Sequence, residues 1–343
     1  MNFELESKTV NFKRAERNVF FHILTKCNLS CSHCYINREQ HSSETLPRQT
    51  VLDWLNLFYD PEKKTNVIFL GGEPTLHPDL ADLIKTANGI GYQSVTVDTN
   101  GYLFHQLLER IEPAEAVLSF SLDGPDPEIN DPIRGAGSFE VCRDNIKQAV
   151  QAGFDVSVIY TVSRWNLDYV GEMPDLLNHL GVKRFFIQVI GLRGKSAAEG
   201  DRLQLTPEEW SGIIPSVARS AADKGLKVIY PKVFLEPGEE FECGGLVAEN
   251  YFIFPNGRVY LCPLCEDYPV SAYRVEDNRM VKNEGLTEDL FFKLNIPEGC
   301  VMNKLLQSGN IDYSEEGLPL NRISCCLLKM QIEPGVQQTE VRG

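Results

Sequence analysis

The stretch VFFHILTKCNLSCSHCY, residues 19–35, joins a run of apolar residues to three closely spaced cysteines. Residues 19–24 are nearly all β-branched, aliphatic or aromatic, which predicts a strand covered on both faces. Cys27, Cys31 and Cys34 follow in the spacing C-x3-C-x2-C, which suits a tight loop folded around an iron–sulfur cubane. A structural zinc site would use four ligands, so a trio of cysteines favours a cluster with one open iron. The sequence therefore predicts a metal-binding loop directly after a buried strand.

Similar runs recur along the chain and alternate with helical patterns. Residues 48–60, 77–91, 138–152 and 166–180 place apolar side chains at helical spacing. Strands that alternate with helices form parallel sheets with right-handed crossovers. The pattern predicts an α/β fold, a partial (β/α)6 TIM-like barrel with functional residues on the loops after its strands. The further strand-like runs are 67–70, 94–98, 117–122, 156–162, 184–190 and 227–230.

The sequence changes in character after residue 190. A polar loop leads to a helix that we expect to begin at Thr206, with Pro207 as its first residue. Residues 231–243 read as a linker, and YFIFPNGRVYLC, residues 251–262, reads as a hairpin turning at Asn-Gly. We expect two domains, a barrel over 17–232 and a smaller hairpin-containing, cluster-binding domain over 233–343.

Composition excludes several classes of protein. The formal net charge of −15 opposes binding to nucleic acid. No run of eighteen apolar residues and no signal peptide is present, so we expect a cytoplasmic protein without a membrane partner. In that compartment the 10 cysteines indicate metal or redox chemistry rather than disulfides.

Four segments together resemble one enzyme family. CNLSCSHCY resembles the cluster-binding signature of the radical S-adenosylmethionine (SAM) enzymes. LGGEPTLHPDL (70–80), VDTNGYL (97–103) and SFSLDG (119–124) resemble segments that follow later strands in that family. The resemblance covers about residues 17–190, in the family's order and always at strand ends.

The resemblance assigns roles to particular residues. It implies that Cys27, Cys31 and Cys34 bind a [4Fe-4S] cluster whose fourth iron binds the amino and carboxylate groups of SAM. The other expected SAM contacts are Tyr35 beside adenine, Gly71, Gly72 and Glu73 at the methionine end, and Ser121 and Asp123 near the ribose or sulfonium. A turn at Gly72 and capping by Ser121 and Asp123 are the structural alternatives. Thr161, Ser163 and Gln188 are further candidates that are equally explained by structural roles, and Arg134 is a candidate whose alternative is a role at the surface.

The implied reaction is a reductive cleavage of SAM. An electron from a donor such as flavodoxin or ferredoxin passes through the cluster and releases a 5′-deoxyadenosyl radical, which abstracts hydrogen from a substrate. The protein orients the cofactors and excludes side reactions. A peptide or protein side chain is our first expectation for the substrate. A small molecule, such as a sugar, cofactor or tetrapyrrole precursor, is the alternative.

A second group of cysteines lies between residues 243 and 326. The pattern formed by Cys243, Gly257 and Cys262 resembles the start of the C-terminal extension known as SPASM, or of its shorter form, twitch. These extensions carry auxiliary [4Fe-4S] clusters. With only six cysteines here, the twitch form with one cluster is favoured. Cys243, Cys262 and Cys265 are the first-choice ligands, and Cys325 is the expected fourth, with Cys326 or Cys300 as alternatives. Zinc is the rival metal for this group, since four thiolates suit it too.

A non-catalytic iron–sulfur electron carrier is the competing class of function. The glycine-glycine-glutamate-proline segment argues against it, because a carrier has no use for a methionine-binding turn. No peptide-recognition segment of about 80 residues is expected before the barrel, because the first strand begins near residue 19. The substrate, the fate of SAM and the oligomeric state are not determined by the sequence.

Overall fold

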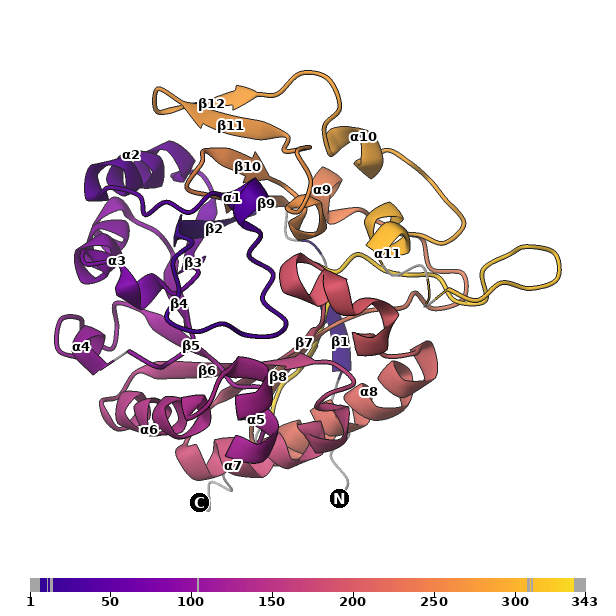
Figure 1. Cartoon of the computed structure of the whole chain (residues 1–343), viewed down its shortest axis with the longest axis horizontal. Coiled ribbons are helices and arrows are strands. Elements are labelled where there is room, and N and C mark those ends of the chain that lie inside the picture. The colour runs from indigo at the N-terminus through magenta and orange to yellow at the C-terminus, as the bar shows by residue number, and fades with distance from the viewer. Residues whose placement is uncertain are drawn as a thin grey trace, which may run out of the picture.

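The computed structural model describes residues 7–10, 12, 15–103, 105–306, 309 and 311–335. Within them the strands form one 13-stranded sheet, in the order β1-β13-β8-β7-β6-β5-β4-β3-β2-β9-β10-β11-β12. Figure 1 shows the strands curving around a central space without closing into a ring, which confirms the predicted partial barrel. The successive parallel strands are β2 (Glu16–Leu24), β3 (Lys64–Gly71), β4 (Ser94–Thr99), β5 (Val117–Ser121), β6 (Asp155–Val162), β7 (Arg184–Val189) and β8 (Lys227–Pro231).

Helices cover the convex face of this sheet (Figure 1). Apolar residues spaced three and four apart, such as Leu55 in α2 and Ile84 in α3, are fully buried against the strands. Strand β6 alternates half-buried and buried residues, so every second side chain points to the concave face. The connecting helices are α2 (Arg48–Phe58), α3 (Leu80–Ile90), α4 (His105–Leu108), α5 (Pro127–Arg134), α6 (Ser138–Gln151), α7 (Met173–Leu180) and α8 (Pro207–Asp223).

The expected helix boundaries depend on their capping residues. Thr206 and Glu209 form a capping box at the start of α8, as Thr206 and Pro207 predict. The pattern over 166–180 is instead divided into a 3-10 turn, η2 (Leu167–Glu172), and α7. Pro174 lies in the first turn of α7, where its missing N–H is tolerated.

The C-terminal hairpin extends one edge of the barrel sheet. Strands β9 (Glu249–Ile253) and β10 (Arg258–Tyr260) are antiparallel, with Gly257 at φ 79°, so the predicted Asn-Gly hairpin is confirmed. Strand β9 also pairs parallel with β2. A second hairpin, β11 (Tyr273–Glu276) and β12 (Arg279–Lys282), was not expected from the sequence and continues the sheet.

The other edge is covered by β13 (Lys329–Ile332), which is antiparallel to β8 and also pairs with β1 (Ser7–Val10). The expected linker is wrong for its first part, because its backbone is paired. Lys232 donates its N–H to the oxygen of Leu328 at 2.9 Å, and Leu235 does so to Arg322 at 2.9 Å. C-terminal segments therefore pair with both edges of the barrel, and the domain boundary at residue 232 stays a prediction.

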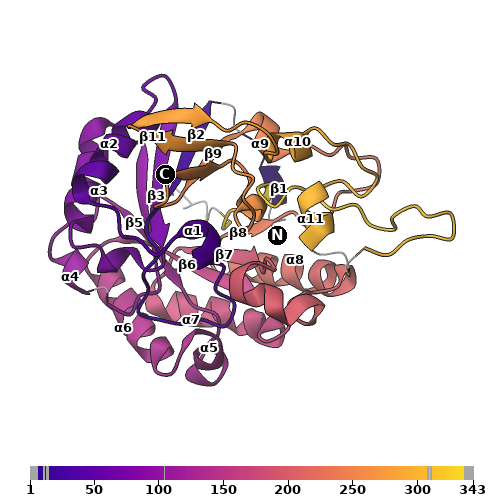
Figure 2. The same ribbon diagram turned by 45° about the horizontal axis from the view of Figure 1, so that its top comes forward.

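The remaining short helices lie at the mouth of the barrel and beside the C-terminal strands (Figures 1 and 2). Within the described residues, no helix combines the length and apolarity that crossing a bilayer requires. The short helices and 3-10 turns are α1 (Arg38–His41), η1 (Pro74–Leu76), η3 (Gly194–Leu203), α9 (Gly244–Val247), η4 (Pro263–Cys265), α10 (Asp289–Phe292) and α11 (Val301–Leu306).

Candidate active site

The loop of residues 25–37, here called the three-cysteine loop, leaves the carboxyl end of β2 and crosses the concave side of the barrel (Figure 1, indigo). Cys27 is exposed, Cys31 and Cys34 are half-buried, and all three are free thiols. Among the described residues, no three His, Cys, Asp or Glu side chains already stand in metal-binding geometry. By chemistry and placement, three thiols on one short loop fit an iron–sulfur cluster.

Gly71 and Gly72 let β3 end directly against the start of this loop. A Cβ atom at Gly71 would lie 2.0 Å from the backbone oxygen of Leu24, and one at Gly72 would lie 2.3 Å from that of Lys26. In this space Gly72 donates its N–H to Leu24 at 3.0 Å, and Glu73 donates its N–H to Lys26 at 2.9 Å. The two glycines therefore fix the backbone from which the first cysteine follows. Their contact with SAM stays a prediction.

The carboxylate of Glu73 joins two of the motif segments. One oxygen accepts from the Thr75 hydroxyl and the Thr99 hydroxyl, both at 2.7 Å, and the other accepts from the N–H of Asn100 at 2.7 Å. Asn100 in turn directs its amide N–H toward the Cys27 sulfur at 3.6 Å. Burial raises the pKa of Glu73 in spite of these donors. Glu73 thus holds the end of β4 beside the three-cysteine loop.

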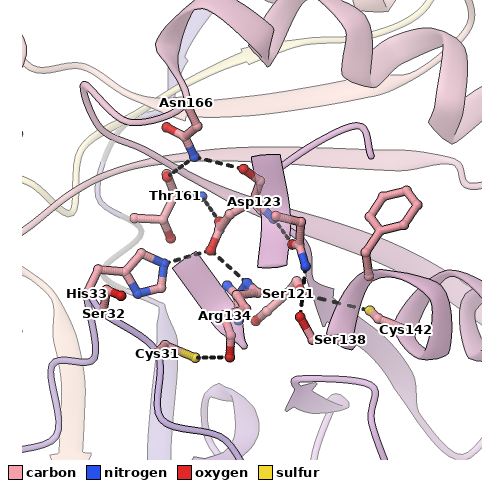
Figure 3. A network of polar contacts seen from close by, with 12 residues as sticks. Cys31, Ser32, His33, Ser121, Asp123, Arg134, Ser138, Cys142, Thr161 and Asn166 are labelled. Atoms are coloured by element: carbon pink, nitrogen blue, oxygen red, sulfur yellow. Dashed lines mark hydrogen bonds and ion pairs between the residues drawn. The ribbon is translucent and has the colours of Figure 1, made fainter. Parts of the chain in front are cut away.

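Asp123, fully buried after β5, holds the loop from the other side (Figure 3). Its Oδ2 atom lies 2.6 Å from Nε2 of His33 and 2.7 Å from Nε of Arg134. Its Oδ1 atom accepts from the N–H of Thr161 at 2.8 Å. Burial disfavours the charged carboxylate, but Arg134 and His33 hold the pKa of Asp123 down at about 2. A buried Asp–Arg–His cluster therefore ties the three-cysteine loop to β5, α5 and β6.

The C-terminal end of α5 makes further contacts with the same loop. Ser32 donates its N–H to the oxygen of Ile133 at 2.8 Å and its hydroxyl to that of Pro132 at 3.3 Å. The Cys31 thiol donates to the backbone oxygen of Arg134 at 3.8 Å. Arg134 is buried, so the surface alternative for this residue is wrong.

The remaining strand-end candidates have mixed surroundings. Ser121 is half-buried, and its backbone oxygen accepts from the Cys142 thiol at 3.8 Å. The cap of α5 is Asp126, so neither Ser121 nor Asp123 caps that helix. Ser163 is fully buried and its N–H donates to Asn166 at 2.8 Å, which is a structural role.

Tyr35 is fixed by an imidazole and a guanidinium. His22 donates its Nδ1–H to the oxygen of Ile253 at 3.0 Å, so its Nε2 accepts from the Tyr35 hydroxyl at 2.9 Å. Burial holds the pKa of His22 well below its usual value, which keeps this neutral form. The guanidinium carbon of Arg193 lies 5.0 Å from the centre of the Tyr35 ring. Contact of Tyr35 with adenine stays a prediction.

Six more free cysteines, here called the auxiliary cysteines, gather beside the C-terminal strands. Gly244 donates its N–H to the sulfur of Cys325 at 3.4 Å. Cys243, Cys262 and Cys265 belong to one packed hydrophobic cluster, and Cys243 directly precedes Gly244. The structure thus brings the four expected ligands together, and their number and chemistry fit an iron–sulfur cluster. The alternatives lie close as well, and the full set is Cys243, Cys262, Cys265, Cys300, Cys325 and Cys326.

Glu288, which sequence reasoning missed, organises this second site. Its buried carboxylate accepts from the N–H groups of Leu261 at 2.7 Å, Cys262 at 3.0 Å and Ala272 at 3.2 Å. Burial raises the pKa of Glu288 to about 8. Nothing in the sequence near Glu288 distinguishes it from the many surface carboxylates of this acidic chain.

His33 and Arg193 were also missed as functional residues. His33 lies within the three-cysteine loop, and Arg193 lies in the segment that was expected to be a polar loop. Their positions in the sequence could have identified them, because both residues follow strands, at the edge of the sheet where the sites of such folds lie.

Comparisons with known proteins show what the barrel is similar to. A profile of the Radical SAM superfamily matches residues 22–177, which contain the three-cysteine loop, Glu73 and Asp123. Residues 22–177 therefore form a radical SAM domain. Enzymes of this family use a [4Fe-4S] cluster and SAM.

Two curated relatives show how far the similarity extends. The chain is 29% identical over 204 residues to the AdoMet-dependent heme synthase of Oleidesulfovibrio alaskensis, a match covering 58% of this chain and 51% of that one. It is 28% identical over 264 residues to the mycofactocin maturase MftC of Mycobacterium ulcerans, covering 69% and 65%. The chain therefore spans about half to two-thirds of these relatives.

Solved structures share the fold at low identity. SuiB of Streptococcus suis bound to S-adenosylmethionine matches with a TM-score of 0.65 and 15% identity, over 84% of this chain and 71% of SuiB. The enzyme anSMEcpe with AdoMet and the Cp18Cys peptide matches with a TM-score of 0.59 and 16% identity, over 85% and 88%. These likenesses show the fold.

Proposed function

We propose that this chain reductively cleaves SAM at a [4Fe-4S] cluster on Cys27, Cys31 and Cys34, and that the resulting 5′-deoxyadenosyl radical abstracts hydrogen from a peptide or protein side chain. The observation that carries the proposal is the three-cysteine loop, which the buried Asp123–His33–Arg134 cluster clamps at the carboxyl edge of the barrel. When bound, the cluster and SAM supply the one-electron chemistry.

The chain's own residues hold the loop in place. Glu73 locks the end of β4 through Thr99 and Asn100, and the Asn100 amide reaches toward the Cys27 sulfur. Asp123 pairs with His33, which lies between the second and third cysteines. Contacts from two sides reduce the motion of the loop, which supports productive positioning of a bound cofactor.

A peptide substrate is supported by how far the similarity reaches. The match to MftC of Mycolicibacterium smegmatis, a maturase, covers 80% of this chain, whereas the match to the heme synthase covers 58%. SuiB bound to its precursor peptide SuiA and anSMEcpe with bound peptides have the same fold. A small-molecule substrate is the second candidate, because the heme synthase and an Fe-coproporphyrin III synthase of Methanosarcina barkeri are also similar.

An auxiliary [4Fe-4S] cluster of the twitch kind completes the proposal, on Cys243, Cys262, Cys265 and Cys325. Cys325 is preferred over its neighbour Cys326 because it accepts a hydrogen bond from the N–H of Gly244, the residue that follows Cys243. Its neighbour Cys326 is the main cause that lowers the pKa of the Cys325 thiol, which favours the thiolate that binds metal. A flavodoxin or ferredoxin would supply the electrons.

Iron counting and product analysis test the proposal. Anaerobically reconstituted protein should bind about eight irons per chain, and replacing Cys27, Cys31 and Cys34 together by Ala should remove about four. With SAM and dithionite the unchanged protein should release 5′-deoxyadenosine, and the triple variant should release none. Absence of deoxyadenosine from fully loaded protein overturns the proposal, and zinc in place of about four irons corrects its second part.

The substrate class needs a separate measurement. A short peptide encoded beside the gene is synthesised with deuterated side chains and incubated with the loaded enzyme. Deuterium in the released deoxyadenosine, together with a mass change in the peptide, supports a peptide substrate. Deoxyadenosine without deuterium favours the small-molecule alternative.

A further inference from the structure

The segment after β7, residues 191–196, contacts the three-cysteine loop. Lys195 donates its N–H to the backbone oxygen of Cys34 at 2.8 Å and its ammonium to the Ser30 hydroxyl at 2.7 Å. Gly194, at φ 56°, lies so close that a Cβ atom there would stand 2.5 Å from the Cys34 oxygen. Only glycine allows this approach of two backbones. One side of the segment is thus fitted to the end of the three-cysteine loop.

The same segment contacts the turn of the auxiliary cysteines. Arg193 donates to the backbone oxygen of Pro263, which lies in η4 between two of these cysteines. Its guanidinium also pairs with Glu266 at 2.6 Å. Gly194 donates its N–H to the carboxylate of Asp267 at 2.8 Å. Three neighbouring contacts therefore join this segment to the second site.

Arg193 lies between the two sites in a nearly buried setting. Its side chain is 15% exposed and that of Glu266 is 2% exposed. Tyr35, which directly follows the last cysteine of the loop, packs beneath the guanidinium at 5.0 Å. The fully buried Ser196 accepts from the Arg193 N–H at 2.9 Å and donates to Gly191 at 2.7 Å, which fixes the turn. Charges in such a position are weakly screened by water.

We propose that Arg193 is a positioning residue that couples the two iron–sulfur sites, because its one buried charge acts on both clusters and its contacts fix Tyr35 against the turn of the auxiliary cysteines. This inference rests on the proposed function, in particular on the auxiliary cluster. A nearby positive charge favours the uptake of an electron by a cluster, and a nearby negative charge opposes it.

The test measures the midpoint potentials of both clusters in the anaerobic, fully loaded enzyme. Each cluster takes up one electron from dithionite in a redox titration followed by electron paramagnetic resonance, at mildly alkaline pH. Arg193→Gln should lower both potentials, and Glu266→Gln should raise both, with the iron content unchanged. Arg193→Lys keeps the charge and should restore both potentials most of the way to the wild-type values. If Arg193 and Glu266 had only structural roles, there would be no reason for their Gln variants to shift the midpoint potentials in opposite directions.

An exposed ion pair of the same kind supplies the control. Arg164 and Glu209 are 2.8 Å apart, but their side chains are 40% and 30% exposed. Arg164→Gln should leave both potentials unchanged, because water screens that charge. An equal shift in Arg164→Gln overturns the inference, since the effect would then not depend on the place of Arg193.

Several outcomes contradict the coupling. The inference is overturned if fully loaded Arg193→Gln protein keeps the wild-type potential at either cluster. It is also overturned if Arg193→Gln and Glu266→Gln shift the cluster potentials in the same direction. If Arg193→Gln loses iron, Glu266→Gln decides alone, and an unchanged potential at either cluster overturns the inference. If the wild-type protein releases deoxyadenosine and carries both clusters, the proposed function stands, and only the coupling by Arg193 has failed. Wild-type protein without the second cluster overturns this inference and the auxiliary-cluster part of the proposed function.

Discussion

The Nε2 atom of His33 lies 2.6 Å from the Oδ2 atom of Asp123, inside the barrel. His33 stands between two cysteines of the loop, and Asp123 stands at the end of β5, 90 residues later. The same oxygen pairs with Arg134 at 2.7 Å. The position of the loop therefore depends on one buried carboxylate.

Asp123→Ala should lower the free energy of unfolding by about 3–5 kcal/mol, because it leaves the Arg134 charge buried without its partner. Denaturant unfolding of the metal-free protein measures this loss. The loaded variant should also bind SAM more weakly, since the three-cysteine loop loses its contact through His33.

An exposed pair provides the comparison for Asp123. Asp155 and Arg184 form an ion pair whose side chains are 41% and 38% exposed. Asp155→Ala should cost less than about 1 kcal/mol. If both variants lose the same free energy of unfolding, burial does not make the Asp123 ion pairs more important for stability than an exposed pair.

Gly72→Ala should prevent normal loading of the first cluster. A Cβ atom at this position would lie 2.3 Å from the Lys26 oxygen, so the start of the three-cysteine loop must move. The expected result is loss of about four irons and of deoxyadenosine release. Gly89→Ala is the matched control, because its Cβ meets nothing within 4 Å in helix α3. That control should add about 0.5–1 kcal/mol of stability and keep all iron. Full iron and activity in Gly72→Ala would contradict the role of this close approach.

His41 should make the protein sensitive to mild acid. Its ring stacks on Phe254 at 4.0 Å, its Nε2–H donates to the backbone oxygen of Glu266 at 3.0 Å, and its Nδ1 accepts from the Asn37 N–H at 3.1 Å. Burial lowers the pKa of His41 from 6.5 to about 4. The unfolded chain therefore binds the proton more readily than the folded one. Stability from this group is complete above pH 6.5 and is lost as the pH falls through about 4.

The loss amounts to about 3 kcal/mol, at about 1.4 kcal/mol for each pKa unit. Unfolding curves recorded between these pH values should show a smaller slope for His41→Asn than for the wild type. The exposed His179 gives the control, and His179→Asn should keep the wild-type slope. An unchanged slope in His41→Asn would mean that other groups cause the acid sensitivity.

Cys325→Ala should remove the auxiliary cluster, whereas Cys326→Ala should keep it. Cys325 accepts from the N–H of Gly244, which directly follows Cys243, and the side chains of adjacent residues diverge. Iron analysis and the electron paramagnetic resonance signal of the second cluster distinguish the two variants. If Cys325→Ala keeps that signal and Cys326→Ala loses it, the fourth ligand of the auxiliary cluster is Cys326 and not Cys325. Loss in both would show that the pair acts together.

The barrel was predictable because its signals are local. A run such as VSVIYTV over 156–162 alternates between the two faces of β6, and the helix patterns fix which faces pack. The linker and the second hairpin were misread or missed because their structure comes from partners far along the chain. Phe234, for example, bridges to Ile323.

The sequence by itself determined the parallel barrel, the three-cysteine loop and the resemblance to radical SAM enzymes, because periodicity and cysteine spacing are properties of neighbouring residues. Only the tertiary structure decided that Glu73 binds the end of β4, that Asp123 meets His33 and Arg134, and that Arg193 joins the two groups of cysteines. These contacts connect the ends of different strands. Parallel strands bring such ends to one edge of the sheet, and no local pattern records which side chains meet there.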